Sequence, residues 1–336
     1  MINVAMIGFG GIAQAVHFPA YAKLEKMGKA KLVAICDIDD GRFNQKMKIN
    51  IAANNASISE EINKYTDWRQ MLDNEEIDMV DICIPTYMHA PITIEVLKLG
   101  YDVLCEKPMS LNYDLCQEMI KAAEESGKKL MIGQCLRFDN YYNYIKKVVD
   151  EKTYGKVKTG IFRRLSTPPV WGWENWFMDY SKSGGCITDL HIHDIDYIRY
   201  IFGEPEKVSC HTQDVYSQKD IAHTVVEYPE HTVLVIGDWS QEGVPFVADC
   251  RIAFENATVD YSNNKITVYP RGGESFEADV IKNDMYFSEI EYFIDKICSG
   301  EENTKNPPES AATSVKLIET IIESSDKNGE SLIFKA

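Results

Sequence analysis

Short apolar runs alternate with helix-type patterns through the first third of the chain, and this alternation is what most restricts the fold. The candidate strands are residues 2–7, 31–36, 79–84, 101–105 and 129–133, and the candidate helices are residues 12–26, 40–52, 67–73, 89–99 and 112–126. Strands and helices that alternate at this spacing form βαβ units. A doubly wound parallel sheet with helices on both faces is therefore predicted.

The pattern changes after about residue 130. Helices are expected at 139–151, 184–202 (closed by Gly203), 284–298 and 308–326, and strands at 156–165, 207–216, 221–228, 232–240, 247–255, 257–261 and 265–269. Consecutive strands joined by short turns favour an antiparallel sheet. With 336 residues, two domains are expected. We predict an α/β protein with a Rossmann domain at 1–128 and an α/β domain at 129–336 that carries a large, open, mainly antiparallel sheet.

Composition excludes several classes of partner. A formal net charge of −17 argues against a nucleic-acid partner, since such proteins concentrate Lys and Arg. The nine cysteines are scattered without a C-x-x-C pair, which is typical of reduced, intracellular proteins, and no metal site is predicted. The chain begins directly with a strand, and no apolar run approaches the ~20 residues of a membrane span. A cytoplasmic protein without a membrane partner is expected.

The segment GFGGIA follows the first strand and opens a helix, in the pattern G-x-G-x-x-A. Gly8 permits a tight turn, Gly10 removes the Cβ that would block a pyrophosphate, and Ala13 lets helix and strand pack closely. The helix N-terminus then faces the phosphates. The strand before and the helix after are the context that this motif requires. The cofactor-binding residues predicted in this turn are Gly8, Phe9, Gly10, Gly11 and Ile12.

Asp37 ends the second strand, 27 residues after Gly10. A carboxylate there accepts hydrogen bonds from the ribose hydroxyls and repels a 2′-phosphate, so NAD is favoured over NADP. Asp39 and Asp40 reinforce that repulsion. The alternative is that Asp37 caps the next helix.

Lys107 lies in the segment EKPMS, directly after the strand 101–105. The carboxyl edge of a doubly wound sheet is where such folds hold ligands. Pro108 restricts the backbone of Lys107, so the lysine is held beside the cofactor as a candidate ligand of a substrate hydroxyl. The alternative is a solvated surface lysine.

The segment DLHIHDID lies in the predicted helix 184–202, whose apolar residues occupy nearly every face. Such a helix is buried, and charged groups inside it must be paired, shifted in pKa or functional. Asp189 and His193 are four residues apart, so they share one face of a continuous helix. The carboxylate would fix the imidazole tautomer, and histidine, with an ordinary pKa near ~6.5, is suited to take a hydroxyl proton. Lys107 would stabilise the developing alkoxide.

The other polar residues of that helix have structural explanations. Asp196 and Arg199 are expected to form an ion pair, and Asp194 to cap the helix or pair with a group of the Rossmann domain. His191 is expected to be a core or interface histidine.

An aromatic loop, PPVWGWENWF, precedes this helix. Trp171 and Trp173 are candidates for stacking on a sugar, or else form an aromatic plug, and the role of Trp176 stays open. Arg137 is either a structural anchor or a substrate ligand.

Four segments together resemble the glucose–fructose oxidoreductase / inositol dehydrogenase (Gfo/Idh/MocA) family: GFGGIA, CDID, DICIPTYMHAPITIEVLKLGYDVLCEKPMS and SGGCITDLHIHDIDYIRYIFG. The resemblance covers nearly the whole chain in the right order. It implies NAD(P)-dependent oxidoreduction of sugars, cyclitols or related small molecules.

The resemblance also assigns site residues. Lys107, Asp189 and His193 match the family's usual catalytic positions, and Pro85, Thr86, His89, Glu106 and Lys107 join the predicted cofactor site. Thr86 replaces the family's usual asparagine, which weakens a side-chain hydrogen bond at that position but leaves the backbone's role near the nicotinamide ribose. The predicted substrate ligands are Lys107, Trp171, Trp173, Asp189 and His193.

The leading hypothesis is an NAD-dependent dehydrogenase that acts on a secondary hydroxyl of a sugar, inositol or sugar derivative. The alternatives are a non-catalytic NAD-binding regulator and an NAD-dependent glycoside-cleaving enzyme that returns its cofactor unchanged. The apolar alternation of 221–228, 232–240 and 247–255, with few helices to cover so large a sheet, predicts a homodimer or homotetramer. The sequence does not identify the substrate or the direction of the reaction.

Overall fold

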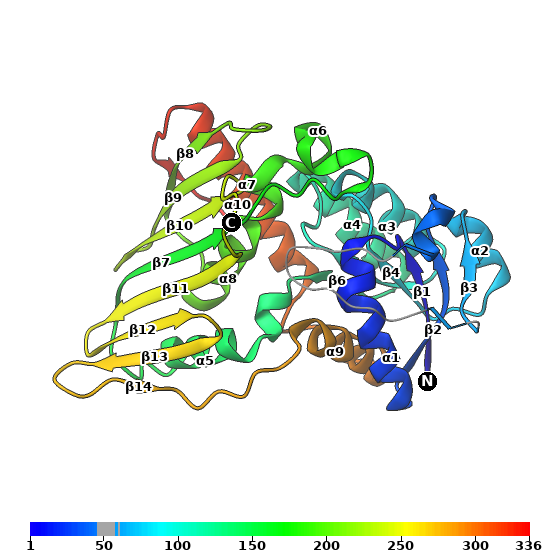
Figure 1. Cartoon of the computed structure of the whole chain (residues 1–336), viewed down its shortest axis with the longest axis horizontal. Coiled ribbons are helices and arrows are strands. Elements are labelled where there is room, and N and C mark those ends of the chain that lie inside the picture. The colour runs from blue at the N-terminus through cyan, green and yellow to red at the C-terminus, as the bar shows by residue number, and fades with distance from the viewer. Residues whose placement is uncertain (46–57, 60) are drawn as a thin grey trace. The chain divides into compact units, whose positions relative to one another are not determined.

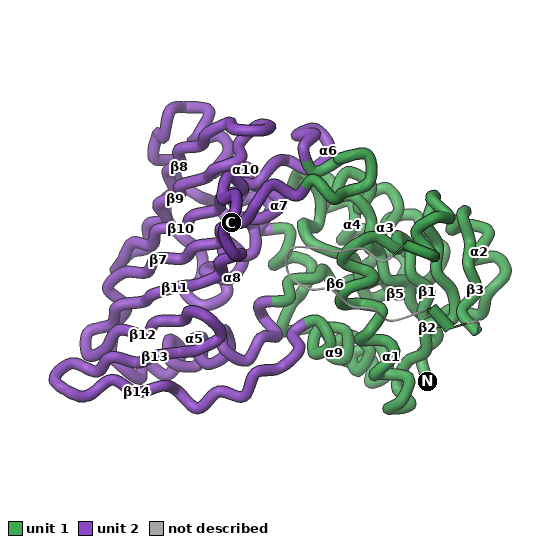
Figure 2. The backbone as a smooth tube through the Cα atoms, in the orientation of Figure 1, with its two compact units in different colours: residues 1–135, 170–177, 286–312 green, residues 136–169, 178–285, 313–336 purple. Residues whose placement is uncertain are grey.

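The computed structural model describes residues 1–45, 58–59 and 61–336. The chain divides into two compact units, and each is described by itself (Figure 2). Unit 1 comprises residues 1–135, 170–177 and 286–312, and unit 2 comprises residues 136–169, 178–285 and 313–336. The predicted boundary at residue 128 stays a prediction about folding domains.

Unit 1 contains a six-stranded sheet in the order β3-β2-β1-β4-β5-β6, and each pair of neighbouring strands is parallel. Its strands are β1 (Ile2–Ile7), β2 (Ala30–Cys36), β3 (Asn63–Tyr65), β4 (Met79–Ile82), β5 (Asp102–Glu106) and β6 (Leu130–Gly133). The sheet is the predicted doubly wound parallel sheet. Strand β3 was not predicted, because three exposed or half-buried polar residues carry no strand pattern.

The helices of unit 1 follow the predicted positions (Figure 1). They are η1 (Ala13–His17, a π-helix), α1 (Phe18–Lys26), η2 (Asp40–Phe43), α2 (Trp68–Asn74), η3 (Thr86–Met88), α3 (His89–Lys98), α4 (Tyr113–Ser126) and α9 (Met285–Ser299). Helix α4 is capped by the Asn112 side chain and ends at Gly127 in the left-handed conformation. Of the predicted helix 40–52, residues 46–52 lie outside the described residues, and the described part is the short η2.

Unit 2 contains a nine-stranded, mainly antiparallel sheet in the order β14-β13-β12-β11-β7-β10-β9-β8-β15 (Figure 1). Its strands are β7 (Val157–Leu165), β8 (Lys207–Gln213), β9 (Ile221–Glu227), β10 (Thr232–Asp238), β11 (Val247–Phe254), β12 (Ala257–Ser262), β13 (Lys265–Pro270), β14 (Phe276–Glu277) and β15 (Leu332–Ile333). Strands β7 and β10 pair in parallel. The hairpin pattern of the sequence does not reveal this pair, because some 65 residues separate the two strands.

The two faces of this second sheet differ in burial. On β7, Phe162 and Arg164 are buried, whereas Ile161 and Arg163 on the opposite face are exposed. Strands β9, β10 and β11 alternate in the same way. Helices α7 (Gly185–Asp189) and α8 (Ile192–Phe202) contact the sheet through β7, β9 and β10. One face therefore forms the core, and the other carries half-buried and exposed side chains within this chain.

The predicted single helix 184–202 is wrong as a continuous element. Helix α6 (Tyr180–Ser183) ends at Gly184, and α7 is separated from α8 by Leu190 and His191. Gly184 and Gly185 both have φ near +70°, which interrupts the helical path before α7. The backbone N–H of His191 bonds to the carbonyl of Cys186, five residues back, so the turn between α7 and α8 is wider than an α-turn. Gly203 ends α8 as predicted.

Buried ion pairs account for the acidic residues of α8. Asp194 accepts two hydrogen bonds from Arg164 on β7, so its partner belongs to unit 2 and not to the Rossmann sheet. Asp196 receives Arg137 in a bidentate pair at 2.7 and 2.8 Å. Arg199 forms the predicted ion pair with Asp196 at 4.0 Å and pairs more closely with Glu204. Because Arg137 is buried and forms a bidentate pair with Asp196, we interpret it as a structural anchor.

The remaining helices of the chain are η4 (Cys135–Phe138), α5 (Asn140–Asp150), η5 (Trp173–Met178) and α10 (Pro308–Asp326). Ser314 on α10 donates to Asp196, adding a third bond to that carboxylate. Among the described residues, no helix is long and apolar enough to cross a membrane.

Candidate cofactor and active site

The glycine-rich turn lies at the carboxyl end of β1, between β2 and β4. Gly8 has φ +89° and donates its N–H to the carbonyl of Cys36 at 2.8 Å. A Cβ on Gly8 would lie 2.3 Å from the carbonyl oxygen of Cys83, which no side chain tolerates. A Cβ on Gly10 would meet nothing within 4 Å. Gly8 is thus required by the fold, whereas the space beside Gly10 is open, as a bound pyrophosphate would need.

The residues after the turn begin the helix that faces it. Gln14 donates its backbone N–H to the carbonyl of Gly10 at 3.0 Å, and its side chain bonds the carbonyl of Phe9. Ala13 is fully buried, as close packing of helix and strand requires. Ile12 has helical backbone angles and precedes η1. The free N–H groups of this first turn make it suited to an anion.

Asp37 lies against this turn. Its carboxylate accepts the backbone N–H of Phe9 at 2.8 Å and that of Asp39 at 3.0 Å. Burial raises the pKa of Asp37, while these two N–H groups and Arg42 oppose the rise. Each carboxylate oxygen keeps a lone pair for a further donor, which a ribose hydroxyl supplies. The next helix is capped by Asp39, whose side chain accepts from the N–H of Gly41, so the capping alternative for Asp37 is not needed.

Arg42 is a charged residue near Asp37 that the sequence analysis missed. Its guanidinium lies 3.3 Å from the Asp39 carboxylate. An arginine near this position favours NADP when it is available to a 2′-phosphate. Here the guanidinium of Arg42 is paired with the carboxylate of Asp39, which offsets its positive charge. The pairing of these residues was not visible from sequence, because it depends on the fold of η2.

The loop after β4 holds His89 between two backbone carbonyls. Its Nδ1 lies 2.7 Å from the carbonyl oxygen of Pro108, and its Nε2 lies 2.9 Å from that of Ile84. Burial lowers the pKa of His89. His89 therefore ties the loop after β4 to the loop after β5. Pro85 precedes the short helix η3, and Thr86 is buried within it; the contributions of all three residues to cofactor binding stay predictions.

Lys107 follows β5 at the carboxyl edge of the sheet. Its backbone N–H donates to the carboxylate of Glu106 at 3.0 Å, and the Lys107–Pro108 peptide bond is cis. Lys107 is half-buried and Glu106 is buried. The lysine is therefore attached to an ordered turn, in agreement with the expectation that its backbone is held.

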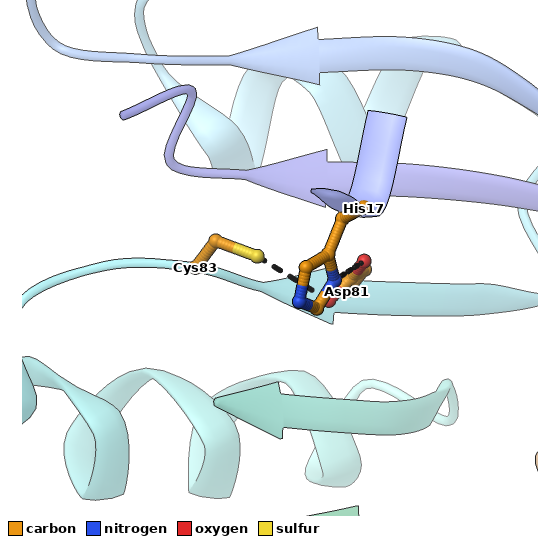
Figure 3. Close-up of side chains that lie close together, drawn as sticks. All are labelled: His17, Asp81 and Cys83. Atoms are coloured by element: carbon orange, nitrogen blue, oxygen red, sulfur yellow. Dashed lines mark hydrogen bonds and ion pairs between the residues drawn. The ribbon is translucent and has the colours of Figure 1, made fainter. Parts of the chain in front are cut away.

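A second group of charged residues lies beneath this turn; Glu106 was predicted as part of the cofactor site, whereas His17 and Asp81 were missed. His17 lies at the end of η1, Asp81 on β4 and Glu106 on β5, and the His17 ring is 2.8 Å from both carboxylates. Figure 3 shows the His17 ring beside Asp81, with the Cys83 thiol directed toward the same carboxylate. Asp81 interrupts the apolar run MVDICI, and an acid in a fully buried strand is a signal that the sequence analysis could have used.

His17, Asp81 and Cys83 also satisfy the spacing expected of metal ligands, since their ligand atoms lie within 4.8 Å of one another. Ligand atoms around a tetrahedral zinc ion stand roughly 3.3 Å apart or more, given bond lengths of about 2.0–2.3 Å. The nitrogen–oxygen distance of 2.8 Å between His17 and Asp81 is that of a direct hydrogen bond. His17, Asp81 and Cys83 therefore form a hydrogen-bonded cluster in this structure.

Asp189 and His193 belong to unit 2, whereas Lys107 and the glycine-rich turn belong to unit 1. Asp189 is the last residue of α7 and is buried; His193 is the second residue of α8 and is half-buried. The break between these helices removes the argument that both residues share one face of a regular helix. Their joint role stays a prediction.

His191 is a structural histidine, as expected. It is fully buried, its Nε2 lies 2.9 Å from the hydroxyl of Thr224, and burial lowers its pKa to about 3. A Cβ on Gly237 would lie 2.8 Å from its Nδ1, so β10 packs directly on the ring. The neutral ring is unsuited to a proton transfer at neutral pH.

The aromatic loop packs partly on itself. The ring of Phe177 stacks on Trp176 at 3.9 Å and contacts Trp171 edge-on at 4.8 Å. Trp176 is buried, and Trp171 and Trp173 are half-buried. These contacts support the aromatic-plug alternative for Trp171 and Trp176. The substrate role of Trp171 and Trp173 stays a prediction.

Two family models match the chain. Residues 2–134 match an oxidoreductase family described by its NAD-binding Rossmann fold, and residues 142–260 match the GFO/IDH/MocA C-terminal domain. The chain belongs to the Gfo/Idh/MocA oxidoreductase family. The resemblance noted from the sequence motifs is thereby confirmed.

Curated relatives within this family carry different activities. The chain is 28% identical over 219 residues to 2,7-anhydro-N-acetylneuraminate hydratase of Escherichia coli, a match that covers 62% of this chain and 52% of the relative. It is 31% identical over 205 residues to myo-inositol 2-dehydrogenase of Thermotoga maritima, covering 60% of this chain and 55% of the relative. The matches thus span little more than half the length of these relatives.

Solved structures support the fold over the full length. The WlbA dehydrogenase from Bordetella pertussis, determined in complex with NADH and UDP-GlcNAcA, superposes with a TM-score of 0.83 at 18% identity and covers 100% of this chain and 99% of that one. At this level of identity the similarity shows the fold alone.

The two glycines of the turn generate a paired prediction. Gly8→Ala should lower the free energy of unfolding by about 1–3 kcal/mol from the positive φ alone, and further because its Cβ would clash with Cys83. Gly10→Ala should leave the melting temperature nearly unchanged but weaken NAD binding. Thermal unfolding and NAD titration of the two variants measure both effects. An equally stable Gly8→Ala variant, or a Gly10→Ala variant that binds NAD normally, would contradict this account.

Proposed function

We propose that this protein is an NAD-dependent oxidoreductase that transfers a hydride between a secondary hydroxyl of a sugar, inositol or sugar derivative and the nicotinamide. The observation that carries the proposal is the turn at Gly8–Gly10 after β1, with an acid at Asp37 after the neighbouring β2 and the Lys107 loop at the same sheet edge after β5, two strands away. Family membership supports the redox class, and the myo-inositol relative supports a polyol substrate.

In this proposal the chain's own residues perform distinct tasks. Lys107 donates a hydrogen bond to the substrate hydroxyl and lowers its pKa. His193 takes the hydroxyl proton, and Asp189 orients the imidazole. NAD, when bound, supplies a nicotinamide carbon that accepts the hydride. Asp194 and Asp196, the acidic residues of α8, are paired with Arg164 and Arg137 and are given structural roles in this proposal.

The cofactor is proposed to be NAD in preference to NADP. Asp37 offers two carboxylate oxygens near the glycine-rich turn, and a 2′-phosphate would meet its negative charge. Asp39 adds a second acid and draws Arg42 toward itself.

A second candidate function is suggested by the hydratase relative. A hydratase adds or removes water without net oxidation. On the present site this corresponds to a substrate that is oxidised transiently and then reduced again, with the cofactor returned unchanged. The same residues would serve, so the two functions differ in whether NADH accumulates.

The protein is further proposed to be a homodimer or homotetramer in the cytoplasm. Its nine cysteines are free thiols, as expected of a reduced compartment. The open face of the nine-stranded sheet carries exposed Ile161 between Thr159 and Arg163, together with half-buried Leu234 and Ile236. Such a face suits a second copy of the chain.

The cofactor assignment is tested at Asp37. Asp37→Ala should raise the Kd for NAD about 10- to 100-fold, because a charge-assisted hydrogen bond to ribose is lost. Asp37→Asn keeps an oxygen for the Phe9 N–H but removes the charge, and should narrow the preference for NAD over NADP. Calorimetric titration with both cofactors measures these values. If the wild type binds NADP as tightly as NAD, the role given to Asp37 is wrong.

The catalytic assignment is tested by turnover on a panel of polyols, sugars and glycosides, followed at the NADH absorbance band. His193→Asn should lower turnover roughly 10²–10⁴-fold and leave the Kd for NAD nearly intact. Because a base must be deprotonated to act, turnover of the wild type should fall as the pH is lowered, and this acid limb should vanish in His193→Asn.

The panel also separates the two functions. NADH that accumulates in proportion to product indicates the dehydrogenase. Product without NADH indicates the hydratase-type reaction. A His193→Asn variant that retains its rate and its acid limb removes His193 from the mechanism.

The oligomer is tested by light scattering at micromolar protein concentration. The wild type should give the mass of a dimer or tetramer, and Ile161→Glu should lower it by placing a charge on the open sheet face. Ile281→Glu is the matched control, because Ile281 is also exposed but lies outside the sheet. A monomeric wild type would contradict the proposal, as would an Ile161→Glu variant of unchanged mass.

A further inference from the structure

His17 lies beneath the Lys107 loop and is enclosed by acids. It is buried at the end of η1, its Nδ1 is 2.8 Å from Asp81, and its Nε2 is 2.8 Å from Glu106. The other oxygen of Glu106 accepts the backbone N–H of Lys107. One carboxylate therefore connects the buried ring to the lysine that the proposed function places at the substrate.

The hydrogen-bond pattern determines where the protons are. Asp81 accepts from the hydroxyl of Tyr21 at 2.9 Å and from the thiol of Cys83 at 3.5 Å, in addition to His17. The oxygens of Glu106 face His17 and the Lys107 N–H. The other partners of these carboxylates, Tyr21, Cys83 and the Lys107 N–H, are donors, and each ring nitrogen of His17 lies within hydrogen-bond distance of one carboxylate. With both carboxylates as acceptors, His17 donates from both nitrogens. Only the imidazolium does so.

The surrounding charges agree with this pattern. Burial alone would lower the pKa of His17, but the charge and hydrogen bond of Asp81, with a further contribution from Cys83, raise it well above 6.5. Burial likewise would raise the pKa of Glu106, but His17 and then Lys107 hold it below its usual value.

The titratable groups that face His17 come from four elements. They are Tyr21 on α1, Asp81 on β4 with Cys83 just after it, Glu106 on β5 with Lys107 just after it, and two residues of α9. On α9, the ring of half-buried Tyr286 is 6.3 Å from that of His17, and Glu289 lies beyond it, near Tyr21. His17 and Lys107 are the cationic groups among them. Removing the imidazolium leaves a buried Glu106 with Lys107 alone to offset the cost of desolvation.

We propose that His17 is a positioning residue: as an imidazolium fixed between Asp81 and Glu106, it keeps Glu106 ionised and so holds the backbone of Lys107 at the carboxyl end of β5. The inference rests on the proposed function for the meaning of Lys107, but its physical content does not require substrate or cofactor. The proposal gives the positive charge of His17 a role in ordering the Lys107 loop. A histidine that only filled space in the core would not need that charge.

The first test is the protonation state of His17 by NMR of protein labelled with ¹⁵N-histidine. Among the signals of the seven histidines, those of His17 are assigned as the set that is missing from the spectrum of His17→Gln. Both ring nitrogens of His17 should keep imidazolium shifts from about pH 6 to 9, well above an ordinary histidine pKa. A neutral ring at pH 7.5 would overturn the proposal. A stoichiometric zinc ion that is lost in His17→Gln would also overturn it, because a metal-bound ring nitrogen carries no proton.

The second test follows Lys107 itself by competitive trace acetylation and mass spectrometry, with exposed Lys121 as the internal reference. In His17→Gln the pKa of Glu106 should rise toward neutrality, so Glu106 takes up a proton as the pH falls. The reactivity of Lys107 relative to Lys121 should then show a step at that pH, absent from the wild type. The double variant His17→Gln/Glu106→Gln should lose the step, because an amide oxygen still accepts the N–H but does not titrate.

Tyr21→Phe is the matched control. It removes a hydrogen bond to Asp81 from the same buried cluster but leaves His17 between its two acids. It should lower the melting temperature without producing the step. A step in Tyr21→Phe, or its absence in a folded His17→Gln variant, would overturn the proposal. Neither measurement needs turnover, so failure of the polyol panel would count against the proposed function and not against His17.

Discussion

The carbonyl of Cys83 approaches the glycine-rich turn so closely that no side chain fits at Gly8. This contact sets how β1 leaves the sheet, and it fixes the position of the turn relative to β2 and β4. Asp37 can then accept the N–H of Phe9, and the helix that starts beyond Gly10 directs its free N–H groups at open space. The proposed cofactor site depends on this one close approach of backbone to backbone.

The two units differ in the residues that neutralise their buried acids. In unit 2, Asp194 and Asp196 are neutralised by Arg164 and Arg137, which reach α8 from elements distant in sequence. These buried pairs tie α8 to the elements packed against it. In unit 1, the acids Asp81 and Glu106 share a single buried histidine, so a net negative charge remains directly beneath the Lys107 loop. A lysine at that position is held by an electrostatic partner and not only by its proline.

The sequence predicted well where local pattern carries the information. Five of the six strands of the parallel sheet, the helix 308–326, and the turn at Gly8 follow from apolar periodicity and glycine chemistry, and the structure confirms them. Features that depend on contacts between residues far apart in the sequence were not predicted. The parallel pairing of β7 with β10, the wide turn at His191 and the partners of Arg137 all depend on contacts between segments far apart in the chain. His17 was missed because the motif stops at Ala13, four residues before it.

The central claim is that this chain moves a hydride between a substrate carbon and nicotinamide, and an isotope measures it directly. The enzyme would be incubated with NAD and a set of polyols and glycosides deuterated at carbon, and the nicotinamide would be analysed by mass spectrometry. The account predicts that deuterium from at least one substrate appears on the nicotinamide ring, in released NADH if oxidation is net, or in the enzyme-bound cofactor of samples quenched within the first turnover if the cofactor is returned unchanged. Protein that is folded and binds NAD, yet transfers no label from any member of the set, would contradict it.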